Sequence, residues 1–163
     1  MEEKKSESIC ELADKIGEKY KDIKDVVLAI QKVILDNAGS LPEKYKPKSI
    51  MESRFIPAEE AYKKGMTSCG AMVNISSEML RHLGYKVKLI HGESKDSVDH
   101  AWISVFDSES DSWIEYDLTK KDAVVLTTNT KKMETDSWEE IRDQIMRDHE
   151  TLEERRRKRG LKD

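Results

Sequence analysis

The spacing of the apolar residues changes twice along this 163-residue chain, and these changes constrain the fold more than any other feature of the sequence. Before Gly84 the apolar residues recur every three or four positions, as they do on one face of a helix. Between Tyr85 and Thr127 they form short runs rich in β-branched and aromatic residues, and from Asp136 the helical spacing returns. Helices followed by a group of strands and then a further helix predict an α+β domain.

Four helices are expected before the strands. Their predicted limits are residues 5–20, 25–37, 57–64 and 68–83. Gly65 and Gly84 end the third and fourth helices, because glycine readily adopts the left-handed conformation found after a helix C-terminus. Thr67 or Ser68 can cap the start of the fourth helix. Residues 40–56 show no clear period and are expected to form a long surface connection.

Four strands, two of them in a hairpin, are predicted next in the sequence. The predicted strands are residues 85–91, 99–106 and 112–118, with a fourth at 123–127. Because the loop 107–111 is short, the second and third strands should form an antiparallel hairpin. A two-residue turn at Ser108 and Glu109 places His100 directly opposite Asp117, with about 4.5–5.5 Å between their Cβ atoms. This register predicts a contact between an imidazole and a carboxylate.

Cys69 lies in the first turn of the predicted helix 68–83, where its thiol can act as a nucleophile. The positive end of the helix favours the thiolate, and a nearby imidazolium favours it further. The same helix N-terminus offers backbone N–H groups that can stabilise an oxyanion. With His100 as the base and Asp117 to orient it, Cys69 completes a predicted catalytic triad that attacks an amide or similar acyl group.

The motifs around these three residues resemble the transglutaminase-like superfamily, a branch of the papain-like thiol enzymes. They are GMTSCGAMV at 65–73, LGYKV at 83–87, DHAW at 99–102 and WIEYDLT at 113–119. The resemblance implies a catalytic cysteine at a helix start, a catalytic histidine on one strand and a catalytic aspartate on the next. These roles fall on Cys69, His100 and Asp117. It also implies a papain-like core in which the catalytic helix packs on an antiparallel sheet.

The chain departs from the usual family pattern at three positions. Thr67 stands where the family commonly has glycine, Met72 where it often has an aromatic residue, and Leu118 where proline commonly follows the aspartate. These departures leave all three reacting groups in place and leave the subfamily and the substrate open.

We expect a single domain over residues 1–163. It comprises an N-terminal helical region (1–56), a transglutaminase-like catalytic core (57–127) and a C-terminal helix (136–160) with a basic end. The expected activity is thiol-dependent acyl transfer on amide or peptide carbonyls, with hydrolysis of the protease or amidase type favoured. The alternatives are transfer to an amine, as in a protein-glutamine transglutaminase, and a non-catalytic interaction domain that keeps the fold.

The other polar and aromatic residues that could belong to the site also fit structural or solvent-exposed positions. His82 and His149 are expected on helices in structural or solvated positions, and His91 at a strand end is a weak candidate for the site. Trp102 and Trp113 fit core packing at least as well as the wall of a substrate groove. The loop 107–111 is interpreted as a polar turn rather than a calcium loop. The basic run 155–159 is interpreted as a solvated helix end, with binding of phosphate groups or anionic lipid as the alternative.

Composition limits the partners and the location. A formal net charge of −4 gives no support for a nucleic-acid partner. The sequence contains no apolar stretch near the ~20 residues of a membrane span, and its charged N-terminus differs from a secretory signal, so a cytoplasmic location is expected. Because the cytoplasm is a reducing compartment, we expect no disulfide between Cys10 and Cys69. Neither cysteine belongs to a Cys-x-x-Cys pair, so we expect no structural zinc or other cofactor. The expected partner is a peptide, protein or small amide substrate, and the oligomeric state stays open.

Overall fold

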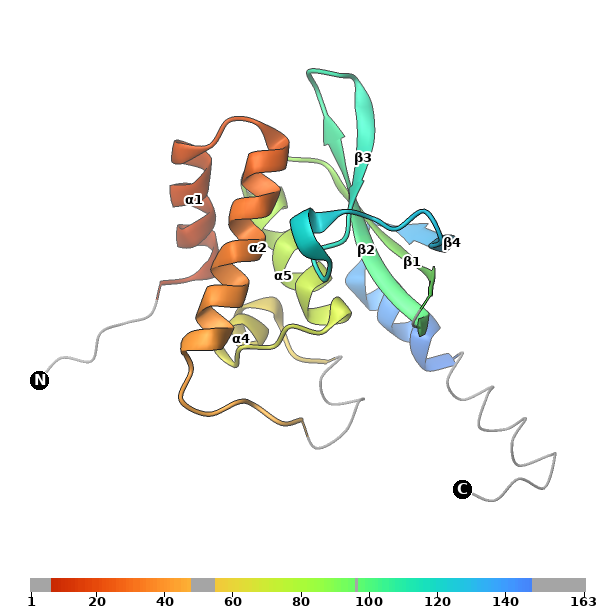
Figure 1. Cartoon of the computed structure of the whole chain (residues 1–163), viewed down its shortest axis with the longest axis horizontal. Helices are drawn as coiled ribbons and strands as arrows, with labels where there is room; N and C mark the ends of the chain where they lie inside the picture. The colour runs from red at the N-terminus through yellow and green to blue at the C-terminus, as the bar shows by residue number, and fades with distance from the viewer. Residues whose placement is uncertain (1–6, 48–54, 96, 148–163) are drawn as a thin grey trace, which may run out of the picture.

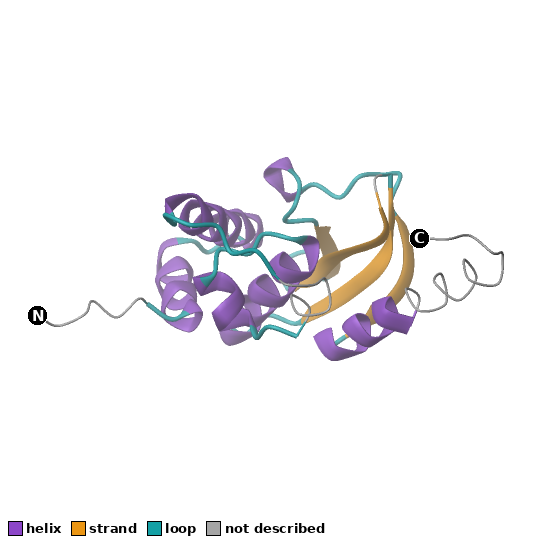
Figure 2. Ribbon diagram, turned by 90° about the horizontal axis from the view of Figure 1, so that it is seen from below, coloured by secondary structure: helices purple, strands orange, loops and turns teal. Residues whose placement is uncertain are grey.

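The computed structural model describes residues 7–47, 55–95 and 97–147 of the chain. Most of its helices gather on one side of a four-stranded antiparallel sheet, and helical residues 138–147 lie beside that sheet (Figures 1 and 2). One helix, α5 (Cys69–His82), contacts the other helices on one side and the sheet on the other. The predicted α+β architecture, with a central helix packed on an antiparallel sheet, is confirmed.

The helices agree with the expected order, with ends shifted by a few residues. They are α1 (Ile9–Lys19), α2 (Ile23–Ser40), α4 (Ala58–Lys63) and α5, followed by a 3-10 turn, η1 (Lys121–Ala123), and the helical residues 138–147. The strands are β1 (Val87–Ser94), β2 (Ser97–Asp107), β3 (Ser112–Tyr116) and β4 (Thr130–Thr135). Gly65 and Gly84 have φ values of 71° and 93°, so both end their helices in the left-handed conformation as predicted.

The N-terminal helices bury the stripe of residues that their spacing predicts. Ser8 caps α1 by accepting a hydrogen bond from the N–H of Glu11 at 3.1 Å. Helices α1 and α2 then pack against α5 through apolar side chains. The buried members of this stripe are Ile9, Ala13, Ile16, Ile23, Val26, Val27, Ile30 and Ile34. The two helices therefore form the outer layer that holds α5 against the sheet.

The sheet has the strand order β3-β2-β1-β4. One face carries Leu89, Ile103 and Val105 into the main hydrophobic core, which α5 also enters. Ile90 and Trp102, which alternation places on the other face, are buried as well. The centre of β2 is therefore packed on both faces, which gives the residues it carries fixed positions.

The fourth strand does not lie where the sequence predicted it. Residues 123–127 instead follow the η1 turn as an irregular connection in which Val124 is 55% exposed, and the N–H of Asp117 bonds to the carbonyl of Ala123 at 3.0 Å. The true fourth strand, β4, pairs with β1 at the edge of the sheet. Its sequence, TKKMET, is mostly exposed, so it lacks the apolar pattern that marks a strand.

The β2–β3 hairpin is present, but the predicted register is wrong by two residues. Asp107 pairs with Ser112 and Phe106 with Trp113, so the loop holds four residues rather than two. The side chain of Asp107 causes this, because it accepts hydrogen bonds from the N–H of Glu109 (3.1 Å) and the hydroxyl of Ser110 (2.9 Å). A shift of two residues keeps every side chain on its predicted face.

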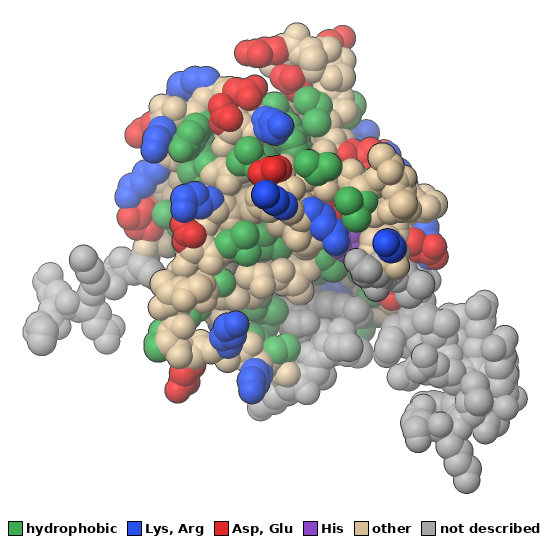
Figure 3. Space-filling model, in the orientation of Figure 1, with side chains coloured by type: hydrophobic (Ala, Val, Ile, Leu, Met, Phe, Trp, Pro, Cys, Tyr) green, Lys and Arg blue, Asp and Glu red, His purple; other side chains and the backbone are tan. Residues whose placement is uncertain are grey.

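Positive and negative side chains are intermixed on the face shown in Figure 3, with hydrophobic side chains between them. Within the described ranges, no helix has the length and apolar character needed to cross a membrane. His149 and the basic run 155–159 lie outside the described residues.

Candidate active site

Cys69 is the first residue of α5 and is partly buried. Ser68 precedes it as the cap, and its Oγ accepts a hydrogen bond from the N–H of Ala71 at 3.3 Å. The N–H groups of Cys69 and Gly70 also belong to the first turn, where a helix offers them no acceptor of its own. The thiol therefore lies beside two backbone donors and the positive end of the helix dipole.

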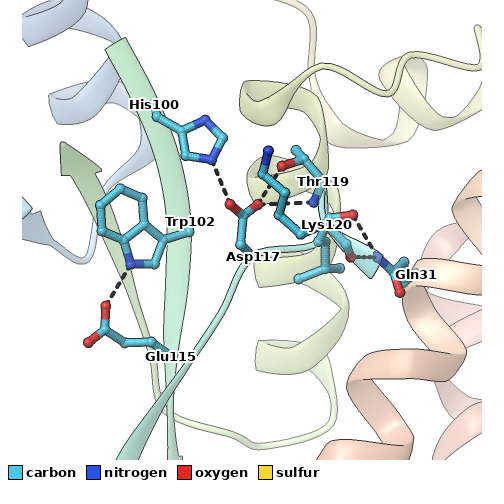
Figure 4. A network of polar contacts seen from close by, with 8 residues as sticks. Gln31, His100, Trp102, Glu115, Asp117, Thr119 and Lys120 are labelled. Carbon is cyan, nitrogen blue, oxygen red and sulfur yellow. Dashed lines mark hydrogen bonds and ion pairs between the residues drawn. The ribbon is translucent and has the colours of Figure 1, made fainter. Parts of the chain in front are cut away.

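His100 lies near the start of β2 and is only 7% exposed. Its Nε2 atom is 2.6 Å from Oδ2 of Asp117 (Figure 4). The side chain of Cys69 also acts on this ring, because it contributes to the raised pKa of His100. Because Asp117 occupies Nε2, Nδ1 is the ring nitrogen that is left for the thiol.

Asp117 follows the last residue of β3 and is completely buried. Oδ2 accepts the hydrogen bond from His100, while Oδ1 accepts two from Thr119: one from its N–H at 3.0 Å and one from its hydroxyl at 2.6 Å. A buried carboxylate needs such donors to remain ionised. Thr119 thus stabilises and orients the carboxylate that contacts His100.

Gln31 of α2 holds the turn that carries Thr119. Its Nε2 atom donates hydrogen bonds to the carbonyls of Leu118 and Lys120, both at 2.8 Å, so that it spans Thr119 (Figure 4). This side chain connects the N-terminal helical layer to the Asp117 turn. Sequence analysis did not predict it, because a glutamine at the edge of an amphipathic helix carries no signal of a partner 87 residues away.

The electrostatics favour charged forms of both His100 and Asp117. The hydrogen bond that His100 donates to Asp117, and then the interaction with the Cys69 side chain, raises the pKa of His100 to about 9, although burial opposes this. Burial raises the pKa of Asp117, but the hydrogen bonds from His100 and Thr119 outweigh it, so that this pKa lies below its ordinary value. An imidazolium between a carboxylate and a thiol is the arrangement that stabilises a thiolate.

The tryptophans of the two strands have different surroundings. The ring of Trp102 lies 5.8 Å from that of His100, and its Nε1 donates to Glu115 at 2.6 Å. Trp102 is buried, so it packs beside the candidate base. Trp113 is 41% exposed and packs on Phe106 away from this cluster.

The hydrogen bonds of the other described histidines go to residues outside the group Cys69, His100 and Asp117. His82 bonds to Asp14 at 2.8 Å and so joins α5 to α1, which is a structural role. His91 is buried, with Nε2 3.3 Å from Asp99, and its Nδ1 has no hydrogen-bond partner in the described part of the chain. Among the described residues, no three His, Cys, Asp or Glu side chains are grouped so that they could hold a metal ion.

The sequence matches the model of one protein family. The model of the transglutaminase-like superfamily matches residues 11–118, which is more than half of the chain and includes Cys69, His100 and Asp117. The chain belongs to the transglutaminase-like superfamily. The resemblance inferred from the sequence motifs is therefore confirmed. No curated protein matches the sequence.

Solved structures share the fold of this transglutaminase-like chain. A candidate cysteine protease from Cytophaga hutchinsonii is 19% identical with a TM-score of 0.59, and the match covers 77% of this chain and 41% of that one. The chain thus spans less than half the length of that protein. Calcium-bound LapG from Legionella pneumophila is 11% identical with a TM-score of 0.47 over 80% of this chain and 84% of that one. At these identities the likeness concerns the fold alone.

Proposed function

We propose that this protein is a thiol-dependent hydrolase of amide or peptide bonds, with Cys69 as nucleophile, His100 as base and acid, and Asp117 as the orienting carboxylate. The observation that carries the proposal is the His100 ring, whose Nε2 atom lies 2.6 Å from Asp117 and whose pKa the side chain of Cys69 also raises. Membership of the transglutaminase-like superfamily supports the same chemistry.

In the acylation step, the Cys69 thiolate attacks the carbonyl carbon and the C–S bond forms. The N–H groups of Cys69 and Gly70 bind the oxyanion that develops on the carbonyl oxygen. When the C–N bond breaks, the His100 imidazolium gives its proton to the departing amine. A thioester on Cys69 and a neutral imidazole remain.

In the deacylation step, neutral His100 takes a proton from water as the water oxygen attacks the thioester. The C–S bond breaks, which releases a carboxylic acid and regenerates the thiolate beside the imidazolium. Throughout both steps the Asp117 carboxylate accepts a hydrogen bond from the Nε2–H group, which keeps Nδ1 directed at the sulfur. The buried carboxylate therefore acts through the orientation and charge of the ring.

An amine can replace water in the second step, which gives a transglutaminase instead of a hydrolase. Water is favoured because the structural relative from Cytophaga hutchinsonii is named as a candidate cysteine protease. The third possibility is a domain that keeps the fold without catalysis, in which the thiol and the ring are present but unreactive.

One experiment separates these outcomes. The purified protein and its Cys69→Ser variant are incubated with a peptide-amide mixture in ¹⁸O-labelled water, with a primary amine present, and the products are analysed by mass spectrometry. Hydrolysis introduces ¹⁸O into a new carboxyl group, whereas amine transfer adds the mass of the amine. The proposal expects the ¹⁸O product from the wild type alone. Equal product from both proteins, or the amine adduct alone, contradicts it.

A further inference from the structure

A cavity of about 230 Å³ lies beside the candidate nucleophile. It is bounded by the start of α5, by β2 and by the helical residues 138–147, which pack beside the sheet (Figure 2). The residues that define it are Ile56, Ala61, Cys69, Ala101, Trp138 and Ile145. Ala101 directly follows His100 on β2, so the cavity adjoins both the thiol and the strand of the candidate base.

The lining of this cavity is mainly apolar and uncharged. Among the described residues that line it, none carries a charged side chain, and the polar ones besides Cys69 are Ser68 and Asn74. Ser68 is engaged as the cap of α5, and Asn74 donates to the carbonyl of Ile56 at 3.4 Å. An apolar cavity of roughly 150 Å³ is enough to bind benzene in another protein, so this one has room for an aliphatic group of several carbons.

Trp138 lines the cavity and lies against the residue that follows the nucleophile. A Cβ atom added at Gly70 would lie 2.8 Å from the far end of the Trp138 indole, which is closer than real Cβ contacts. The glycine after Cys69 therefore lets the indole lie against the first turn of α5. As a result, a side chain of the C-terminal helical segment limits the space beside the thiol.

We propose that this cavity binds an aliphatic part of the acyl group that is transferred to Cys69, and that Trp138 sets the length it accepts. The inference rests on the proposed function and adds a substrate class to it. The preferred acyl donors are peptides or amides with an aliphatic side chain next to the attacked carbonyl, whereas charged side chains are excluded. The transfer of such an aliphatic group from water into the apolar cavity supplies the binding free energy.

The test uses p-nitrophenyl esters of acetic, butyric and hexanoic acid, and it measures the burst of p-nitrophenolate as Cys69 is acylated. Each rate is divided by the rate of the same ester with a small free thiol. The corrected rate is expected to rise about fourfold for each added methylene that enters the cavity. Equal corrected rates for the three esters would overturn the inference.

Two variants change the cavity in opposite directions. Ala61→Leu fills it and should abolish the preference for hexanoyl over acetyl, while Trp138→Ala enlarges it and should extend the preference to octanoyl. Trp113→Ala is the matched control, because Trp113 is exposed and absent from this lining. Circular dichroism checks that each variant is folded. An unchanged chain-length profile in folded Trp138→Ala contradicts the role of Trp138.

Failure of the proposed function can be distinguished from failure of this inference. N-alkylmaleimides of increasing chain length add to the Cys69 thiol without any acyl chemistry. If the esters give no burst but the maleimides show the chain-length preference, the acyl-transfer function is wrong and the aliphatic site stands. If the esters acylate Cys69 and neither series shows a preference, the function stands and the aliphatic site is wrong.

Discussion

The Nε2 atom of His100 lies 2.6 Å from Oδ2 of Asp117, although these residues are not partners in the β2–β3 ladder. The ladder ends where Ile103 pairs with Tyr116, and the chain then turns, so that Asp117 approaches His100 diagonally. The contact therefore depends on the turn after β3 and on Thr119 within it. Strand pairing alone does not fix it.

Replacing Asp117 with asparagine should shift the alkaline limb of the pH–activity profile to lower pH. The hydrogen bond that His100 donates to Asp117 is the largest cause of the raised His100 pKa of about 9. The imidazolium that protonates the departing amine therefore persists up to about pH 9 in the wild type and is lost above it. In Asp117→Asn that proton is lost at lower pH. The measurement is kcat/KM for amide hydrolysis across the pH range, and an unmoved alkaline limb contradicts the assignment.

Replacing Gln31 with leucine should lower kcat while leaving KM largely unchanged. The substitution removes both hydrogen bonds to the turn that orients Asp117, and a small misplacement of a catalytic group reduces rate by about tenfold or more. The alkaline limb should move in the same direction as in Asp117→Asn, which a purely structural role would not produce. Lys32→Leu, one residue along α2 at an exposed position, is the control and should behave like the wild type.

Two glycine substitutions should change stability in opposite directions. A Cβ atom at Gly92 would collide with the backbone carbonyl of Thr130 and lie 2.7 Å from the indole of Trp102, so Gly92→Ala should destabilise the fold by about 3 kcal/mol. At Gly39 in α2, nothing in the described structure lies within 4 Å of the added atom, so Gly39→Ala should stabilise it by about 0.5–1 kcal/mol. Urea unfolding of both variants and of the wild type measures these changes in the free energy of unfolding. A Gly92→Ala variant as stable as the wild type would show that β4 does not pack closely on β1.

Features that depend on local sequence could be predicted. The caps, the glycine terminators and the apolar stripes give α1, α2, α4 and α5 directly, and with them the position of Cys69 at a helix start. The pairing of His100 with Asp117 was also expected, but through a register that the structure corrects. The error of two residues kept the pair on one face of the sheet, which is why the contact was anticipated despite it.

Features that depend on distant contacts or on exposed segments could not be predicted. Strand β4 carries mostly solvent-facing polar residues, whereas the apolar run 123–127 lies in a connection. The contacts of Gln31 and the position of Trp138 over Gly70 each join segments far apart in the chain. No periodicity or short motif in the sequence indicates such long-range contacts. The catalytic roles of Cys69, His100 and Asp117 stay a prediction until they are measured.

The most direct test of the central claim is the rate at which iodoacetamide alkylates Cys69 at about pH 6, read by peptide mass spectrometry. Cys10 serves as a reference in the same molecule, because burial and then the nearby carboxylates, Glu78 first, raise the pKa of its thiol. The account predicts that Cys69 reacts about tenfold faster or more than Cys10, and that His100→Ala removes this advantage. If Cys69 reacts no faster than Cys10, or equally fast without His100, the thiol and the ring do not form a reactive pair and the account is wrong.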